Sequence, residues 1–75
     1  MNWKDYAENN GVKWEYSDNS ALGCREYTFK YGDKRLDYLI PYVVLKDFPE
    51  KAINEELKTR VCSLIWGNER SIAHE

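Results

Sequence analysis

The chain has 75 residues, with 11 Lys and Arg residues against 13 Asp and Glu residues and a formal net charge of -2. This length is typical of one domain. The charge argues against a nucleic-acid binder that works through bulk positive charge, although it leaves room for a local basic patch. The longest apolar run is about half of the roughly 20 residues that a membrane helix needs, and no basic-then-apolar leader is present. We therefore expect a cytoplasmic protein without membrane contact.

Two short elements open the chain. Residues 2–10 predict a helix, with Asn2 as its capping residue. Residues 12–17 alternate between apolar and charged side chains, which is the pattern of a strand with one solvated face. The polar stretch 17–23 predicts a loop.

The best-specified segment, residues 24–40, predicts a β-hairpin. It turns at Gly32 and Asp33, a pair suited to a tight turn whose first residue has a positive φ. A two-residue loop places Tyr27 opposite Tyr38 and segregates the apolar side chains on one face, whereas a slip by one residue would mix apolar and charged side chains. The other pairs expected from this register are Arg25 with Ile40, Phe29 with Leu36, Glu26 with Leu39 and Thr28 with Asp37.

Residues 47–66 predict a longer helix, with Asp47 and Glu50 as a capping box, Pro49 in its first turn and Gly67 at its end. Its apolar stripe comprises Ile53, Leu57, Val61, Leu64 and Ile65. The order of elements predicts an α+β fold, a two-layer αβββα domain in which two helices pack on one face of a three-stranded antiparallel sheet. We expect a single domain over residues 1–67 and a polar C-terminal tail over residues 68–75.

No constellation of side chains indicates catalysis. The one histidine, His74, lies beside the C-terminus, far from Cys24 and Cys62 in the sequence. The two cysteines are interpreted as reduced, buried or half-buried thiols, and too few ligands are present for a structural zinc site. The adjacent Glu55 and Glu56 point in different directions on a helix and are expected to be surface charges. We expect neither enzyme activity nor a cofactor or metal site.

The segment "LDYLIPYVVL", residues 36–45, is apolar on both faces if it forms one strand. Two interpretations remain open. In the first, the strand bends at Pro41, which cannot donate a ladder hydrogen bond, and residues 42–45 pack beneath the start of the last helix. In the second, the outer face is an exposed apolar surface, which tends to mark a binding site. The residues of that surface are Leu39, Pro41, Val43 and Leu45.

This surface favours a small non-catalytic protein-interaction module that acts as an adaptor, subunit or inhibitor. Its partner would be a second copy of the chain, giving a homodimer, or a larger protein complex. An inhibitor encoded by a phage or mobile element would fit the size and character of the chain.

The alternative is a nucleic-acid-binding module. The phrases "KDYAENNGVKWEY" and "FKYGDKRLD" loosely resemble the start and the hairpin of a double-stranded-RNA-binding domain. That resemblance implies the αβββα order and contact with RNA through the first helix, the first hairpin loop and the start of the last helix. Here the loop "SDNSALG" has no basic residue, and the last helix opens with two acids in "DFPEK". The residues expected to contact nucleic acid are Lys13, Lys30, Lys34, Arg35 and Lys51.

Overall fold

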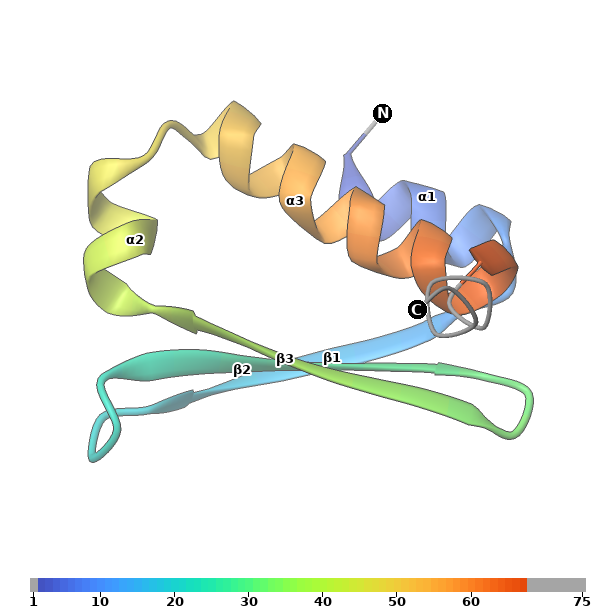
Figure 1. The fold of residues 1–75 in the computed structure, drawn as a ribbon, viewed down its shortest axis with the longest axis horizontal. Coiled ribbons are helices and arrows are strands. Elements are labelled where there is room, and N and C mark those ends of the chain that lie inside the picture. The colour runs from blue at the N-terminus through green and yellow to red at the C-terminus, as the bar shows by residue number, and fades with distance from the viewer. Residues whose placement is uncertain (1, 68–75) are drawn as a thin grey trace, which may run out of the picture.

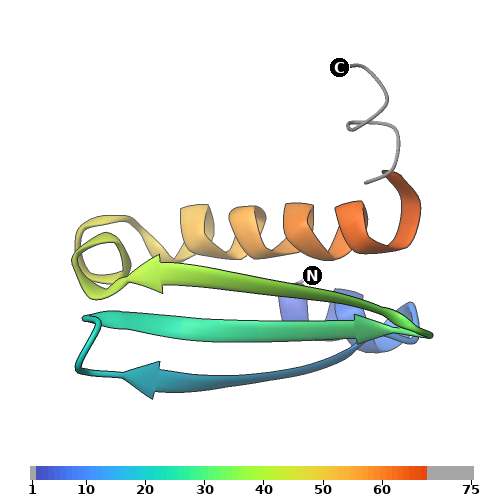
Figure 2. The same cartoon turned by 60° about the horizontal axis from the view of Figure 1, so that its bottom comes forward.

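A computed structural model describes residues 2–67; the expected polar tail and His74 lie outside these residues. The chain forms two layers, a three-stranded antiparallel sheet in the order β1-β2-β3 and helices over one of its faces (Figure 1, Figure 2). The elements are α1 (Trp3–Asn9), β1 (Lys13–Asn19), β2 (Cys24–Tyr31), β3 (Lys34–Pro41), α2 (Tyr42–Asp47), α3 (Glu50–Cys62) and a terminal π-helical turn, η1 (Ser63–Gly67). The predicted α+β fold is confirmed, with α2 as an additional short helix.

The hairpin of β2 and β3 has the predicted register. Tyr27 lies directly opposite Tyr38, and the turn between the strands begins at Gly32. The φ of Gly32 is 62°, a conformation that glycine adopts with little strain because it lacks a Cβ atom. The other predicted pairs are also observed: Arg25 with Ile40, Phe29 with Leu36, Glu26 with Leu39 and Thr28 with Asp37. The pattern of apolar side chains in the sequence therefore predicted the pairing of β2 with β3 correctly.

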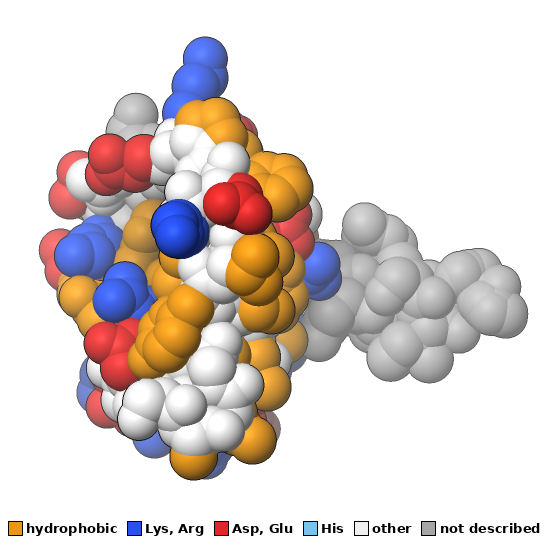
Figure 3. All heavy atoms as spheres, turned by 90° about the vertical axis from the view of Figure 1, so that its left-hand side faces the viewer, with side chains coloured by type: hydrophobic (Ala, Val, Ile, Leu, Met, Phe, Trp, Pro, Cys, Tyr) orange, Lys and Arg blue, Asp and Glu red, His pale blue; other side chains and the backbone are white. Residues whose placement is uncertain are grey.

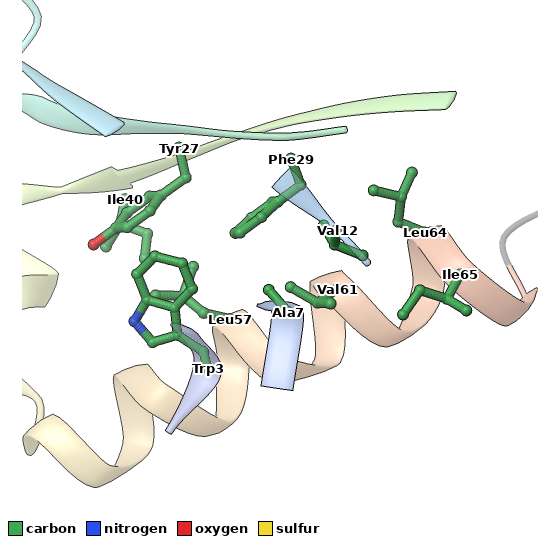
Figure 4. Packing of buried hydrophobic residues seen from close by; sticks show 10 residues of the cluster. All are labelled: Trp3, Ala7, Val12, Tyr27, Phe29, Ile40, Leu57, Val61, Leu64 and Ile65. Atoms are coloured by element: carbon green, nitrogen blue, oxygen red, sulfur yellow. The ribbon is translucent and has the colours of Figure 1, made fainter. Parts of the chain in front are cut away.

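The hydrophobic core lies between the sheet and the two helices α1 and α3 (Figure 4). The Trp3 ring packs edge-on against Tyr27 and Phe29, with 5.7 Å between ring centroids in both pairs. Such edge-to-face contacts add to the free energy gained by burying the rings. The buried residues of the cluster are Trp3, Ala7, Val12, Tyr27, Phe29, Ile40, Leu57, Val61, Leu64 and Ile65. Four residues of the predicted helical stripe are thus buried, and the fifth, Ile53, is half-buried against them.

Helix α1 is capped as predicted and is tied to α3. The Asn2 side-chain oxygen accepts a hydrogen bond from the Asp5 backbone N–H at 2.9 Å. The Trp3 backbone N–H donates to the Asn54 side-chain oxygen at 2.6 Å, although 51 residues separate the two in the chain. These bonds satisfy two N–H groups that have no partner within the helix.

The second interpretation, in which the strand continues through residues 42–45, does not describe the backbone. β3 ends at Pro41, and residues from Tyr42 onward form helix α2. Pro41 lies opposite Cys24, and its φ of -60° and ψ of 147° make it the extended N-cap of the new helix. The Tyr42 N–H donates to the Gly23 carbonyl at 2.9 Å, in line with the ladder of β2 and β3. The first interpretation, a bend at Pro41, therefore describes the backbone.

The start of the last helix also differs from the prediction. α3 begins at Glu50 with Pro49 as its N-cap, and no side chain caps it. The predicted capping box fails because Asp47 is the last residue of α2, and Phe48 separates the two helices. A proline suits this N-cap because its fixed φ is compatible with entry into a helix.

The two cysteines have different environments. Cys24 is buried, with 6% of its surface exposed, as expected for a small apolar side chain. Cys62 is exposed, so the prediction that it is at least half-buried is wrong. Cys62 follows the buried Val61, and one residue along a helix turns the side chain by about 100° away from the stripe. Both thiols are free.

Candidate functional site

The predicted apolar surface is present in part. Leu39 and Val43 are 51% and 60% exposed, and Pro41 between them is exposed as well. Leu39 and Pro41 come from the outer face of β3, whereas Val43 comes from α2. Leu45 does not join them, because it lies on the other side of α2 and packs half-buried against the core. We call Leu39, Pro41 and Val43 the apolar strip.

The apolar strip lies where the sheet edge meets α2. Hydrophobic side chains are visible over much of this end of the molecule (Figure 3). On the outer sheet face, Leu39 lies across from Glu26, and Asp37 precedes it by two residues on the same strand. β3 is an edge strand, so its outward main-chain groups have no strand partner among residues 2–67. The strip therefore adjoins backbone groups that are free to pair with another strand.

The basic residues predicted for nucleic-acid contact are separated into two groups. Lys13 pairs with Lys30 across β1 and β2, and Lys30 pairs with Arg35 across β2 and β3, which makes one basic row on the outer sheet face. Lys34 lies beside this row at the hairpin turn. Lys51 is in the first turn of α3, at the opposite end of the molecule, where α2 meets α3 (Figure 1).

The basic row is partly neutralised within the sheet. The Arg35 guanidinium donates to the Asp37 carboxylate at 3.2 Å, and the Thr28 hydroxyl donates to the same oxygen at 3.0 Å. Both charged side chains of this ion pair are largely exposed, so the pair contributes little to stability.

A cleft that the sequence analysis missed lies between the sheet and the helices. It has a volume of about 860 Å³, is open to solvent, and lies where α2 and the start of α3 face the start of α1. The side chains around it combine cations, aromatic rings and amides. The lining residues are Asn2, Trp3, Lys4, Tyr16, Arg25, Tyr27, Tyr42, Leu45, Lys46, Glu50, Lys51, Ile53, Asn54 and Leu57.

One cation of this cleft is held by aromatic rings. The Lys4 ammonium lies 5.8 Å from the Trp3 ring centroid, 5.2 Å from that of Trp14 and 5.8 Å from that of Tyr16. Trp14 and Tyr16 stack with an interplanar angle of 10° and so form a common surface beneath the charge. Cation–π attraction of this kind restrains the ammonium without neutralising it.

A second cation, Arg25, is held by a carboxylate and a ring. Its Nε donates to the Asp18 carboxylate at 2.7 Å, and its guanidinium lies 4.9 Å from the Tyr16 centroid. The hydrogen bond from Arg25 lowers the pKa of Asp18. Burial raises the pKa of the Tyr27 hydroxyl, which Arg25 partly offsets. Burial also raises the pKa of the Tyr42 hydroxyl, with the Asp18 charge adding to the effect.

Glu56 has a structural role in place of the solvated one that was expected. Its carboxylate accepts hydrogen bonds from the Tyr38 hydroxyl at 2.7 Å and from Arg60 at 2.8 Å. The Arg60 guanidinium also lies 4.6 Å from the Tyr38 ring centroid. The Tyr38 hydroxyl, and next the Arg60 guanidinium, lower the pKa of Glu56. This cluster ties β3 to α3, whereas Glu55 is an exposed charge as predicted.

Among residues 2–67, no group of three or more His, Cys, Asp and Glu side chains is placed to hold a metal ion. Within the same residues, no helix combines the length and apolar character needed to cross a bilayer. In comparisons with known proteins, no family model, curated protein or solved structure matches the chain.

One signal of the cleft was present in the sequence. The predicted register placed Arg25 opposite Ile40, on the face of the hairpin that is otherwise apolar. A guanidinium is rarely buried without a partner, so an arginine at such a position indicates that the core opens there. No comparable signal pointed to Lys4, Lys46 and Lys51, which reach the cleft from three different helices.

Proposed function

We propose that the chain is a small non-catalytic module that binds a partner protein through the apolar strip. The observation that carries this proposal is the exposure of Leu39 and Val43 on either side of Pro41. On the outer sheet face around them, most other side chains are charged or polar. A contiguous apolar surface with a polar rim is typical of protein-binding sites.

The edge position of β3 indicates what such a partner presents. An extended segment can add to an open sheet edge through main-chain hydrogen bonds, while its side chains contact the apolar strip. Pro41 limits the length of that pairing because it lacks an N–H. We therefore propose an extended, partly apolar segment of another protein as the partner, in keeping with a role as adaptor, subunit or inhibitor.

The proposal includes a cytoplasmic setting. The chain has two cysteines far apart in the sequence, whereas small secreted domains usually carry a denser disulfide framework, and this supports the setting. An inhibitor encoded by a phage or mobile element would be one protein of this kind.

The test is the double variant Leu39→Glu/Val43→Glu. Both side chains are exposed, and the new carboxylate at residue 39 lies across from Glu26, so we expect a loss in the free energy of unfolding of less than about 1 kcal/mol per site. Binding should be lost, because a carboxylate buried without a partner in an interface is costly. The matched control is Trp66→Glu, an equally exposed apolar residue in η1, at the other end of the molecule.

Two measurements decide the result. Circular dichroism reports folding, and analytical ultracentrifugation together with quantitative affinity capture reports self-association and partner binding. Proteins captured by the wild type and by Trp66→Glu, but not by the double variant, would support the proposal. A folded double variant that keeps every interaction of the wild type would refute it, and an unfolded one would show that these residues belong to the core.

A second candidate function, nucleic-acid binding, is favoured by the basic row of Lys13, Lys30 and Arg35. Binding of this kind weakens steeply as salt concentration rises, because cations are released from the phosphates. A mobility-shift titration across salt, with Lys13→Glu/Lys30→Glu as the variant, tests it. Tight duplex binding that the variant abolishes would favour this candidate over the apolar strip.

A further inference from the structure

We propose that the cleft between α1, α2 and α3 is a second binding site, which takes an acidic peptide segment carrying an apolar side chain. The site is distinct from the apolar strip and lies on the other side of α2. Tyr42, Leu45 and Lys46 of α2 line the cleft, whereas Val43 is exposed in the strip.

The charge of the cleft is the first argument. Its lining includes four cations, Lys4, Arg25, Lys46 and Lys51, but one carboxylate, Glu50, in a chain whose net charge is -2. Only Arg25 of the four has an ion-pair partner among the described residues. Concentrated positive potential on an acidic protein is a feature that attracts a negatively charged ligand.

The hydrogen-bonding groups of the cleft are the second argument. The side-chain oxygens of Asn2 and Asn54 already accept backbone N–H groups, so their amide NH₂ groups are what they offer a ligand. At the start of α3, the backbone N–H groups of Glu50 and Lys51 precede the first helical hydrogen bonds and have no side-chain cap, whereas those of Ala52 and Ile53 donate to the Pro49 carbonyl. The cleft is therefore rich in donors and poor in acceptors, which suits a ligand whose polar groups are carboxylate and carbonyl oxygens.

The arrangement of the charges distinguishes a peptide from a compact phosphate group. The four cations come from α1, β2, α2 and α3 and are thus distributed around the cleft, not gathered on one element. Spaced carboxylates along an extended chain match such a distribution. The apolar surface between the cations is provided by Trp3, Leu45, Ile53 and other lining residues. It can receive one apolar side chain of the peptide, and the volume of about 860 Å³ is within the range of ligand sites.

The experiment is an NMR titration of the ¹⁵N-labelled chain with two end-capped probe peptides. The first alternates Glu and Leu, and the second has every Glu replaced by Gln. We expect the acidic peptide to shift backbone resonances of Lys4, Tyr42, Lys46 and Lys51, with binding that weakens as salt is added. The Gln peptide should bind at least about tenfold more weakly, because it lacks the charges that the cleft attracts.

Matched charge reversals distinguish the effect of the cleft cations on peptide binding from the effect of the net charge of the protein. Lys46→Glu/Lys51→Glu changes two exposed cleft residues, and Lys30→Glu/Lys34→Glu makes the same charge change at the distant hairpin turn. The first pair should weaken the acidic peptide about tenfold or more, and the second less than about twofold. Circular dichroism confirms that both variants are folded.

Several results would overturn the proposal. They are no shifts at millimolar acidic peptide, equal binding of the Gln peptide, shifts confined to the outer sheet face, or equal losses in the two variants. A duplex RNA that shifts the cleft resonances at lower concentration than the peptide would assign the cleft to nucleic acid instead. Leu39→Glu/Val43→Glu leaves the cleft intact, so its effect on partner binding through the apolar strip is measured independently of this titration. Either proposal can therefore be refuted without the other.

Discussion

Leu57 is the residue whose truncation tests the packing of the domain most directly. It is fully buried at the centre of α3, among the side chains that join this helix to the sheet (Figure 4). Leu57→Ala removes the equivalent of three methylene groups, or about 2.4 kcal/mol of transfer free energy at about 0.8 kcal/mol each. The cavity left behind adds to this loss, and measured Leu→Ala changes in cores span about 2 to 5 kcal/mol.

The position of Leu57 narrows this range. Leu57 is fully buried but is among the residues that line the cleft, so side chains at the cleft wall can move into part of the vacated space. The cavity contribution should therefore be small, and we expect a loss of about 2 to 3.5 kcal/mol in the free energy of unfolding. At about 0.05 to 0.15 kcal/mol per residue, a 75-residue domain has roughly 4 to 11 kcal/mol in total. One truncation would thus remove a large share of the stability.

Urea denaturation followed by circular dichroism measures this effect. With an m-value of about 1 kcal/mol/M for so small a domain, the midpoint should fall by about 2 to 3.5 M. The control is Thr59→Ala, on the exposed side of the same helix, which should move the midpoint by less than about 0.5 M. A midpoint of Leu57→Ala equal to that of the wild type would show that α3 does not pack through this stripe. An equal fall in both variants would show that the loss is not specific to the buried stripe of α3.

Two further predictions concern individual side chains. Tyr38→Phe removes the hydroxyl donor to Glu56 and should cost about 1 kcal/mol at neutral pH. Because the folded-state pKa of Glu56 is lowered, its stabilisation is present above its unfolded pKa and is lost as pH falls through the folded value. The difference between Tyr38→Phe and the wild type in urea denaturation should therefore shrink in acid, and a difference that grows in acid would contradict the assigned hydrogen bond. The exposed Cys62 should react with a thiol reagent such as Ellman's reagent in the native state, and the buried Cys24 only after unfolding. Mass spectrometry of the singly labelled chain, with Cys62→Ser as control, would refute this if Cys24 reacts first.

The parts of the fold that were predicted correctly depend on contacts close in sequence. The hairpin register follows from alternation with a period of two around a turn whose first residue is Gly32, and both signals lie within residues 24–40. The stripe of α3 likewise repeats along one helix. In both cases a shift of the pattern by one residue would expose apolar side chains, so other strand registers and other orientations of α3 are strongly disfavoured.

For residues 42–45 two interpretations stayed open, and neither included a helix. These four residues are all apolar, and a short continuous apolar run fits a buried strand as well as a helix. The Tyr42 N–H still donates to the Gly23 carbonyl in line with the β2–β3 ladder, but β2 begins at Cys24, so no partner strand lies opposite residues 43–47. The start of β2 lies outside residues 36–47, so no pattern within them reveals it. The predicted capping box at Asp47 was wrong because it assumed that no helix preceded Pro49, whereas Asp47 is the last residue of α2.

Pro41 connects this correction to both proposed sites. Leu39 lies on the open edge strand β3, which ends at Pro41, and Val43 is exposed in the helix that begins after it. The same helical turn directs Tyr42 and Lys46 toward the cleft. A strand that had continued through residue 45 would have placed Val43 and Leu45 on one surface and removed this wall of the cleft. The two sides of α2 that the proposed sites use, one apolar and one basic and aromatic, therefore both result from the change from strand to helix after Pro41.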